Sequence, residues 1–211
     1  MPKPSTATSG PGRPKDLAKR QAILDAAKQL FLSKGFASTS MDAVASAAGV
    51  SKLTVYSHFD DKERLFSEAV VATCQEQLPQ LLFELPAGAT LHEVLLNIGH
   101  GFQALISCDD SVNLHRLIMA SGGQDPGLCE VFYSAGPLRI IHEMEGLLRR
   151  VDASGALRID NPLNAAEHFF CLLKGGPNFR LLLGCAPPLE ADAAQTHVAE
   201  VVDLFMRAYR P

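Results

Sequence analysis

Polar side chains gather in a short segment, residues 51–59, where their types and spacing suit recognition of a nucleic acid. The segment offers hydrogen-bond donors on Thr54, Ser57 and His58, and Lys52 adds a donor with a positive charge. Such groups can bind phosphate oxygens or the edges of bases. Val55, Tyr56 and Phe59 supply apolar surface at helical spacing, so the donors would share the remaining edge of a helix. An ordinary solvated helix face has a similar composition, and the spacing alone leaves that alternative open.

A second short helix is predicted immediately before this segment. Its apolar residues recur at i, i+3, i+4 and i+7, namely Met41, Val44, Ala45 and Ala48. Gly49 would end that helix, and Ser51 would begin the next as its N-cap, since a serine hydroxyl accepts a free backbone N–H of the first turn. Two short helices joined by a glycine-containing turn form the helix-turn-helix, whose second helix fits the major groove of DNA.

The surrounding segment, residues 21–70, contains a set of short anchors in a fixed order. They are Lys34-Gly35-Phe36, Thr39-Ser40, Ala48-Gly49-Val50-Ser51, Tyr56-Ser57-His58-Phe59 and Lys62-Glu63. In this combination the segment, about a quarter of the chain, resembles the N-terminal DNA-binding domain of the TetR/AcrR family of bacterial transcriptional regulators. The resemblance implies a sequence-specific regulator, expected to be a repressor, whose partner is double-stranded DNA with a palindromic operator.

We expect two groups of contacts with DNA. The base edges would be approached by Lys52, Leu53, Thr54 and Ser57. The phosphates would be contacted by Thr39, Ser40, Tyr56, His58 and Lys62, and Ser51 belongs to the same DNA-binding surface. Leu53 departs from the small residue often found at that point in the family, and it would suit apolar contact with a thymine methyl group.

Basic residues are concentrated towards the N-terminus. Residues 1–58 carry a net charge of +5 and residues 59–211 one of −9, which together give the net −4 of the chain. A basic end on an acidic body suits a protein that touches phosphates at one end only. Residues 1–16 are rich in Pro, Gly, Ser and Thr. We expect them to form a flexible basic arm whose Arg13 lies in a minor groove, although a plain basic tail would have the same composition.

Helical patterns continue along the chain, and no alternating strand pattern of useful length appears. The other predicted helices cover about 17–34, 60–82 with Pro79 as a bend or end, 91–106, 111–120, 127–151, 162–183 and 191–209. Thr39 with Asp42, and Asp60 with Glu63, are the expected capping pairs of the second and fourth helices. We therefore predict an all-α protein of about nine helices. Its parts are the arm (1–16), a three-helix helix-turn-helix domain (17–62) and a larger helical effector-binding and dimerisation domain (63–211).

The last two predicted helices are apolar around most of their circumference, which exceeds the stripe that one packed face needs. The family resemblance implies that they form a four-helix homodimer interface. The expected interface residues are Phe169, Phe170, Leu173, Phe179, Leu182, Val198, Val202 and Phe205. Ordinary packing within one chain is the alternative. Gly175-Gly176-Pro177 must interrupt the first of these helices, and the sequence leaves the role of that break open.

The middle helices are expected to enclose an effector cavity, because the resemblance implies a ligand site that alters the separation of two recognition helices. The candidate lining residues are Phe83, Phe102, His115, Met119, Phe132, Tyr133, His142 and Met144. Each of them could also be plain core or surface. The region is apolar with few charges, which favours a small hydrophobic or aromatic effector that releases DNA by a population shift.

Other classes of function have less support. The sequence contains no glycine-rich phosphate loop, no Gly-x-Ser-x-Gly and no His-Glu-x-x-His, so no enzyme activity, cofactor or metal is predicted. Its cysteines lack paired spacing and are expected to be reduced, although one could be a redox sensor: Cys74, Cys108, Cys129, Cys171 and Cys185. No apolar run long enough for a membrane span and no signal segment is seen, which favours a cytoplasmic protein. Two alternatives remain, a helical scaffold without specific DNA binding and an enzyme that uses the central cavity.

Overall fold

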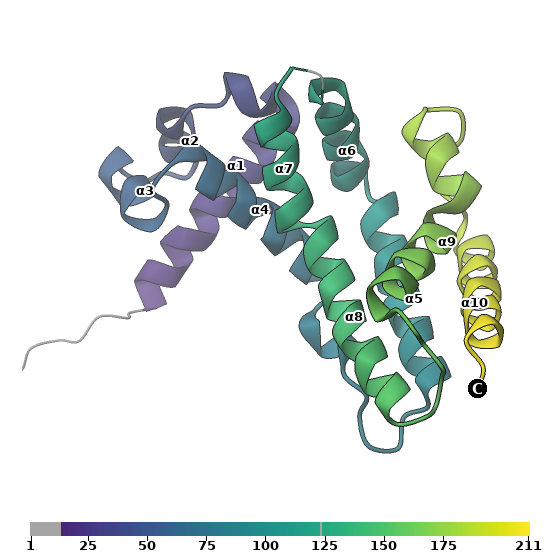
Figure 1. The fold of residues 1–211 in the computed structure, drawn as a ribbon. Coiled ribbons are helices and arrows are strands. Elements are labelled where there is room, and N and C mark those ends of the chain that lie inside the picture. The colour runs from purple at the N-terminus through teal and green to yellow at the C-terminus, as the bar shows by residue number, and fades with distance from the viewer. Residues whose placement is uncertain (1–13, 123) are drawn as a thin grey trace, which may run out of the picture. The chain divides into compact units, whose positions relative to one another are not determined.

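The computed structural model describes residues 14–122 and 124–211 of the chain (Figure 1). These residues form ten α-helices and one short 3₁₀ helix, and they contain no β-strand. The all-α prediction is thus confirmed. The chain forms two compact units, which meet in the sequence between Leu65 and Phe66. Within the described residues, no helix combines the length and the apolar character needed to cross a membrane.

The first unit contains three helices, α1 (Pro14–Ser38), α2 (Met41–Ala47) and α3 (Lys52–His58). Their apolar faces close over a small core that includes Ile23, Leu24, Ala27, Phe31, Val44, Val55 and Phe59. Gly35 has φ 79° and ψ 167°, and this non-helical residue breaks α1 where the sequence predicted its end. Glycine tolerates a positive φ because it has no Cβ.

The second unit is a helical bundle. The helix α4 (Lys62–Gln77) begins in the first unit and continues into the second, and η1 (Gln80–Phe83) follows it. The other helices are α5 (Leu91–Ser107), α6 (Asp109–Ser121), α7 (Pro126–Ala135), α8 (Pro137–Ala153), α9 (Pro162–Leu182) and α10 (Ala191–Ala208). Packing of α5 against α9 and α10, and of α8 against α9, encloses most of the core (Figure 1). Its fully buried side chains include Leu95, Ile98, Met144, Leu147, Phe169, Leu173 and Phe205.

One helix expected from the sequence is divided in two. The sequence suggested a continuous helix over 127–151, whereas α7 ends at Ala135 and α8 begins at Pro137. Gly136 between them has φ −112° and ψ −85°, and Pro137 has no N–H to donate into the preceding turn. These two residues therefore separate the helices, and the number rises from the expected nine or so to ten.

The interruption expected at residues 175–177 lies inside α9. Gly175 has φ 45° and ψ −158°, and Pro177 offers no N–H to the carbonyl of Leu173, four residues earlier. The Nε2–H of His197, on α10, donates to that carbonyl over 2.9 Å. The break in α9 thus replaces one intrahelical hydrogen bond with a bond that ties α9 to α10.

Candidate nucleic-acid interface and internal cavity

The turn between α2 and α3 is held by local hydrogen bonds. Gly49 has φ +65°, and the N–H of Val50 donates to the carbonyl of Ala45 over 3.0 Å, which closes the end of α2. The hydroxyl of Ser51 accepts from the N–H of Thr54 over 3.1 Å and caps the start of α3, where the sequence placed the cap. Residues in or beside the turn therefore fix both helix ends, and the result is a helix-turn-helix.

The helix α3 has one buried edge and one exposed edge. Val55 has no exposed surface, and Phe59, which follows the helix, keeps only 1%. Leu53, by contrast, is 80% exposed and Tyr56 is 42% exposed. The outer edge also carries Lys52, so it combines apolar surface with a cation. Such an edge has the chemistry needed to contact thymine methyl groups and base acceptors.

An acidic partner on the neighbouring helix holds Lys52. The Nζ of Lys52 lies 2.8 Å from Oδ1 of Asp42, which is on α2, and both side chains are largely exposed. The hydrogen bond to Asp42, followed by the negative charge of that residue, raises the pKa of the Lys52 ammonium. The lysine is therefore charged at neutral pH, and water screens its attraction to the aspartate.

Two residues that were expected to contact phosphates close the end of α1. Thr39 is only 2% exposed, and its hydroxyl donates to the carbonyl of Gly35 over 2.8 Å. The ammonium of half-buried Lys62 donates to the carbonyl of Phe36 over 2.9 Å and lies 4.4 Å from the centre of the Phe36 ring. Both groups thus satisfy carbonyls at a helix end. Thr39 has almost no surface to offer a phosphate, contrary to the sequence-based expectation.

The expected capping residues are displaced by one position. Ser40, and not Thr39, caps α2, because its hydroxyl accepts a backbone N–H of the first turn over 3.1 Å. Likewise Asp61, and not Asp60, accepts a backbone N–H over 2.6 Å at the start of α4. In both places two residues able to cap a helix are adjacent, and only the backbone conformation decides between them.

The other residues expected to contact DNA differ in how accessible their polar atoms are. The hydroxyl of Ser57 donates to the carbonyl of Thr54 over 2.7 Å, and the Thr54 hydroxyl lies 2.8 Å from that of Ser51. His58 is half-buried, and its Nε2 has almost no exposed surface, so that atom is closed to a phosphate. Arg13 lies outside the described residues.

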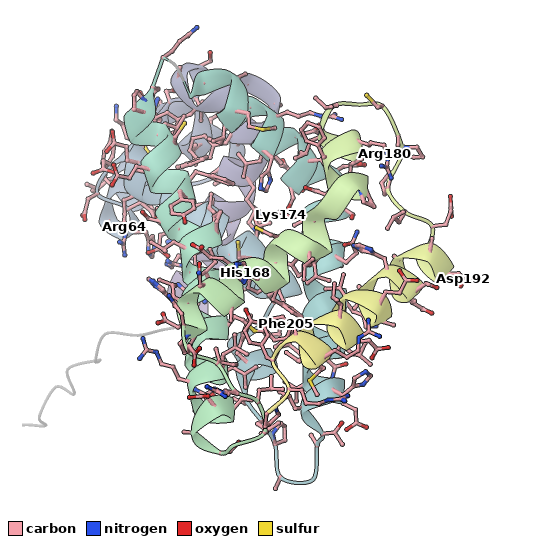
Figure 2. All side chains as sticks on the ribbon, turned by 45° about the vertical axis from the view of Figure 1, so that its right-hand side comes forward. Arg64, His168, Lys174, Arg180, Asp192 and Phe205 are labelled. Carbon is pink, nitrogen blue, oxygen red and sulfur yellow. The ribbon has the colours of Figure 1, made fainter. Side chains whose placement is uncertain are left out.

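The second unit contains a largely apolar cavity of about 70 Å³. One water molecule needs about 10–15 Å³ by the same measure, so the space holds several waters or a small ring. Six helices, α4 to α9, contribute its wall, which includes Cys74, Phe102, His115, Phe132, Phe170 and Lys174. Figure 2 shows Lys174 on α9.

Three of the eight residues expected to line a cavity do so, Phe102, His115 and Phe132. The other five lie elsewhere, contrary to expectation. Two of them, Phe83 and Met144, are buried in the core. The remaining three are exposed, Met119, Tyr133 and His142. The rotation of each middle helix about its axis decides which side chains reach the cavity, and periodicity does not reveal that rotation.

Several lining residues were missed from the sequence. Among them are Cys74, Ser111, Phe170 and Lys174. All four belong to i, i+4 pairs of lining residues, Val70 with Cys74, Ser111 with His115 and Phe170 with Lys174, and such pairs lie on one face of a helix. This spacing is the one signal that would have extended the prediction, from His115 back to Ser111.

Two titratable groups in the cavity wall are neutral at pH 7. Burial is the main cause that lowers the pKa of His115; its hydrogen bond to the carbonyl of Ser111, 2.7 Å long, opposes that shift, and the charge of Lys174 adds to it. Burial also raises the pKa of the Cys74 thiol to about 11. A thiol with so high a pKa is a poor nucleophile, so Cys74 is not suited to redox sensing.

Most residues assigned to a dimer interface are buried in the core of their own chain. These are Phe169, Phe170, Leu173, Val198, Val202 and Phe205, none of them more than 4% exposed. A side chain without exposed surface has nothing to bury against a second subunit, so their assignment needs correction. Phe179, in contrast, is 63% exposed, and Leu182 is half-buried. The other exposed large apolar residues on or next to α9 and α10 are Leu163, Leu172, Leu183 and Leu204.

Comparison with known proteins relates both units to bacterial regulators. Residues 23–69 match the family model of the bacterial regulatory proteins, tetR family. Residues 93–211 match the model of the C-terminal domain of AefR-like transcriptional repressors. The chain is 26% identical over 202 residues to the uncharacterized HTH-type transcriptional regulator YdeS of Bacillus subtilis (strain 168), covering 94% of this chain and 92% of that protein.

Solved structures agree over nearly the whole chain. A putative TetR-family regulator from Mesorhizobium loti MAFF303099 superposes with a TM-score of 0.76 at 27% identity, over 94% of this chain and 100% of the other. The Flavonoid-responsive Regulator FrrA superposes with a TM-score of 0.72 at 34% identity, over 92% and 97% respectively. With a helix-turn-helix in the first unit, and with matches to family models over residues 23–69 and 93–211, this chain belongs to the TetR family of bacterial transcriptional regulators.

Proposed function

We propose that this regulator is a homodimeric repressor that binds a palindromic operator and leaves it when a small apolar or aromatic effector fills the cavity. The observation that carries the proposal is that α3 has one edge buried in the core and one edge exposed. Val55 anchors this helix in the core, while Leu53 and Lys52 stand on its outer edge. Such a helix can enter a major groove without uncovering the core. The match of residues 93–211 to AefR-like transcriptional repressors favours repression over activation.

On the operator, the outer edge of α3 would read the bases. Leu53 would contact a thymine methyl group, and Lys52 would exchange Asp42 for a phosphate or a guanine. Thr54 and Ser57 would add hydroxyl contacts. Ser40 and Tyr56 would contact phosphates, and Arg13 would lie in a neighbouring minor groove. Lys62 would contact a phosphate only if it gave up its hydrogen bond to the carbonyl of Phe36.

Two copies of the chain are needed for a palindromic site. One α3 reads one half-site, and the second half-site lies one helical turn of DNA away, about 34 Å. The exposed apolar residues of α9 and α10 would supply the contact between copies. Phe179 is 63% exposed and Leu183 is 61% exposed. Burial of one such side chain contributes about 1.5–3 kcal/mol relative to leaving it in water.

The cavity would hold the effector. Phe102, Phe132 and Phe170 line it, and aromatic walls pack well against a ring. The structural relative FrrA is described as flavonoid-responsive, and a flavonoid is an aromatic molecule. If the effector binds more tightly to a dimer arrangement that does not fit the operator, it raises the population of that arrangement and the protein leaves the DNA. Because bacterial operators lie in the cytoplasm, the protein would act there.

The test is a selection of bound fragments from random duplex DNA by the full-length protein, followed by native mass spectrometry of the complex. We expect an inverted repeat bound by two copies or by two pairs of copies. The Lys52→Ala/Leu53→Ala double variant should lose the enriched motif while it keeps its helical content. Binding that depends on salt but not on sequence, in the unaltered protein, would instead indicate a helical scaffold and overturn the regulator proposal.

A further inference from the structure

The geometry points to a specificity rule for the cavity: it selects ring compounds that carry a hydroxyl group, and Nε2 of His115 accepts the hydrogen bond from that hydroxyl. The inference rests on the proposed role of the cavity as the effector site. It adds the identity of the polar group that an effector must present, and the residue that reads it.

The hydrogen bond within α6 determines the tautomer of His115. Its Nδ1 lies 2.7 Å from the backbone carbonyl oxygen of Ser111. A carbonyl oxygen only accepts, so Nδ1 carries the proton. In a neutral imidazole the other nitrogen, Nε2, is then an acceptor. Among the described residues no group donates to Nε2, and this atom is not fully buried.

The ring of His115 is also held in orientation. It meets the ring of Phe132 edge-on, with 5.2 Å between centroids and an interplanar angle of 86°. Both rings line the cavity. Because Nδ1 is engaged by Ser111, Nε2 is the nitrogen that remains for a hydrogen bond with a molecule in the cavity. Fixing the ring in advance lowers the entropy that binding would otherwise cost.

Two hydroxyl groups of the wall already take part in hydrogen bonds. The hydroxyl of Thr73 donates to the carbonyl of Ala69 over 3.1 Å. The hydroxyl of Ser111 lies 3.2 Å from the Sγ of Cys108, with the thiol as donor. The thiol of Cys74 is protonated, because burial raises its pKa to about 11. His115 is thus the lining side chain best placed to accept a proton from a ligand.

The polar groups of the wall disfavour two chemical classes. A ketone has no proton to donate, so its oxygen would meet the lone pair of Nε2. An organic ammonium ion would be repelled by the charge of Lys174, which is close enough to act on the His115 ring. A phenol satisfies both conditions, since it donates to Nε2 while its oxygen carries partial negative charge towards the lysine. Phe102, Phe132 and Phe170 suit its ring.

The experiment compares p-cresol, 4-methylanisole and toluene as probes of the full-length protein, by NMR titration. The first two differ only by a methyl group on the oxygen, and toluene lacks the oxygen. We expect p-cresol to bind about tenfold more tightly than 4-methylanisole, the difference that one net hydrogen bond gives. In His115→Phe the preference should vanish while toluene still binds. His142→Phe, at an exposed histidine of α8 outside the cavity, is the matched control and should keep the preference.

A second measurement on the unaltered protein avoids any loss of fold in the variant. The ¹⁵N resonance of Nε2 in His115 should move towards that of a hydrogen-bonded nitrogen with p-cresol, and stay in place with 4-methylanisole. Equal affinity for these two probes, or an unmoved resonance, would overturn the hydroxyl rule and leave the effector cavity standing. If none of the three probes bound, the effector role of the cavity would fail as well.

Discussion

The outer edge of α3 and the cavity of the second unit are built in opposite ways. On α3 and beside it, polar groups are held by partners near in sequence, as in Ser57 with Thr54 and Lys52 with Asp42. The wall of the cavity comes from six helices, and its lining residues lie between positions 70 and 174. The first surface depends on one turn, and the second depends on the packing of a whole bundle. A change to the α3 edge should therefore alter binding alone, whereas a change to the cavity wall should also alter stability.

The largest expected effect is on the cavity side of this comparison. Phe170 is 4% exposed, and its ring lies 4.6 Å from that of Phe102 and 5.5 Å from that of Phe169. Phe170→Ala should lower the free energy of unfolding by about 3–5 kcal/mol, because it removes a buried ring and leaves a void. Urea denaturation followed by circular dichroism measures this loss.

Leu53→Ala is the matched control, since it also truncates a large apolar side chain, but one that is 80% exposed. It should change the free energy of unfolding by less than about 0.5 kcal/mol. Equal losses in the two variants would mean that the cavity wall is no better packed than the surface of α3, and the contrast between the two regions would disappear.

The next effect concerns the two neighbouring residues on the outer edge of α3. Lys52→Ala should weaken operator binding by about 1–3 kcal/mol at one base position if the lysine binds guanine, or reduce the salt dependence by about one phosphate if it binds the backbone. Leu53→Ala should weaken binding only to operators that carry the contacted thymine, with an unchanged salt dependence, because it removes no charge. Fluorescence anisotropy at several salt concentrations separates these results. Unaltered affinity in both variants would show that this edge does not face DNA.

A smaller effect should follow from freeing Lys52. Asp42→Asn removes the carboxylate that holds the ammonium at 2.8 Å, and it removes a negative charge beside the DNA-binding edge. Operator affinity should rise by a few-fold, less at high salt, while stability changes by less than about 1 kcal/mol because the pair is exposed. Asp192→Asn, at an exposed aspartate of α10, is the charge-matched control and should leave affinity unchanged (Figure 2). Weaker binding in Asp42→Asn would show that the aspartate positions the lysine for DNA.

The same contrast explains what the sequence could predict. Gly49 and Ser51 act on their own neighbours, one as a residue with positive φ and the other as an N-cap, so their roles follow from type and position. Where two caps compete side by side, as with Thr39 and Ser40, sequence spacing is not sufficient, and the choice depends on where the chain turns.

In the second unit, the sequence predicted where most helices lie, but it did not predict which side of each helix faces the core, the cavity or the surface. Met144 and His115 both sit in helices of the middle of the chain, yet one is sealed in the core and the other lines the cavity. Likewise, Phe170 and Phe179 have the same side chain on one helix, but the break at Gly175 lies between them, and only Phe179 is exposed. Which side of a nearly all-apolar helix meets a partner is set by tertiary packing, which no local pattern records.

The smallest expected effect is on the pH dependence of stability, through the buried ring of His115 in the cavity wall. The pKa of His115 is below its ordinary value of about 6.5, mainly because burial disfavours the charged ring. The unfolded chain therefore takes up a proton at this ring before the folded chain does, and the free energy of unfolding falls as the pH drops through about 6.5 towards the folded-state pKa. His115→Phe lacks the titrating group and keeps the aromatic contact with Phe132, so its stability should depend less steeply on pH over that interval. Urea denaturation at a series of pH values measures the two slopes, and identical slopes would mean that His115 is as free to charge in the folded protein as in water.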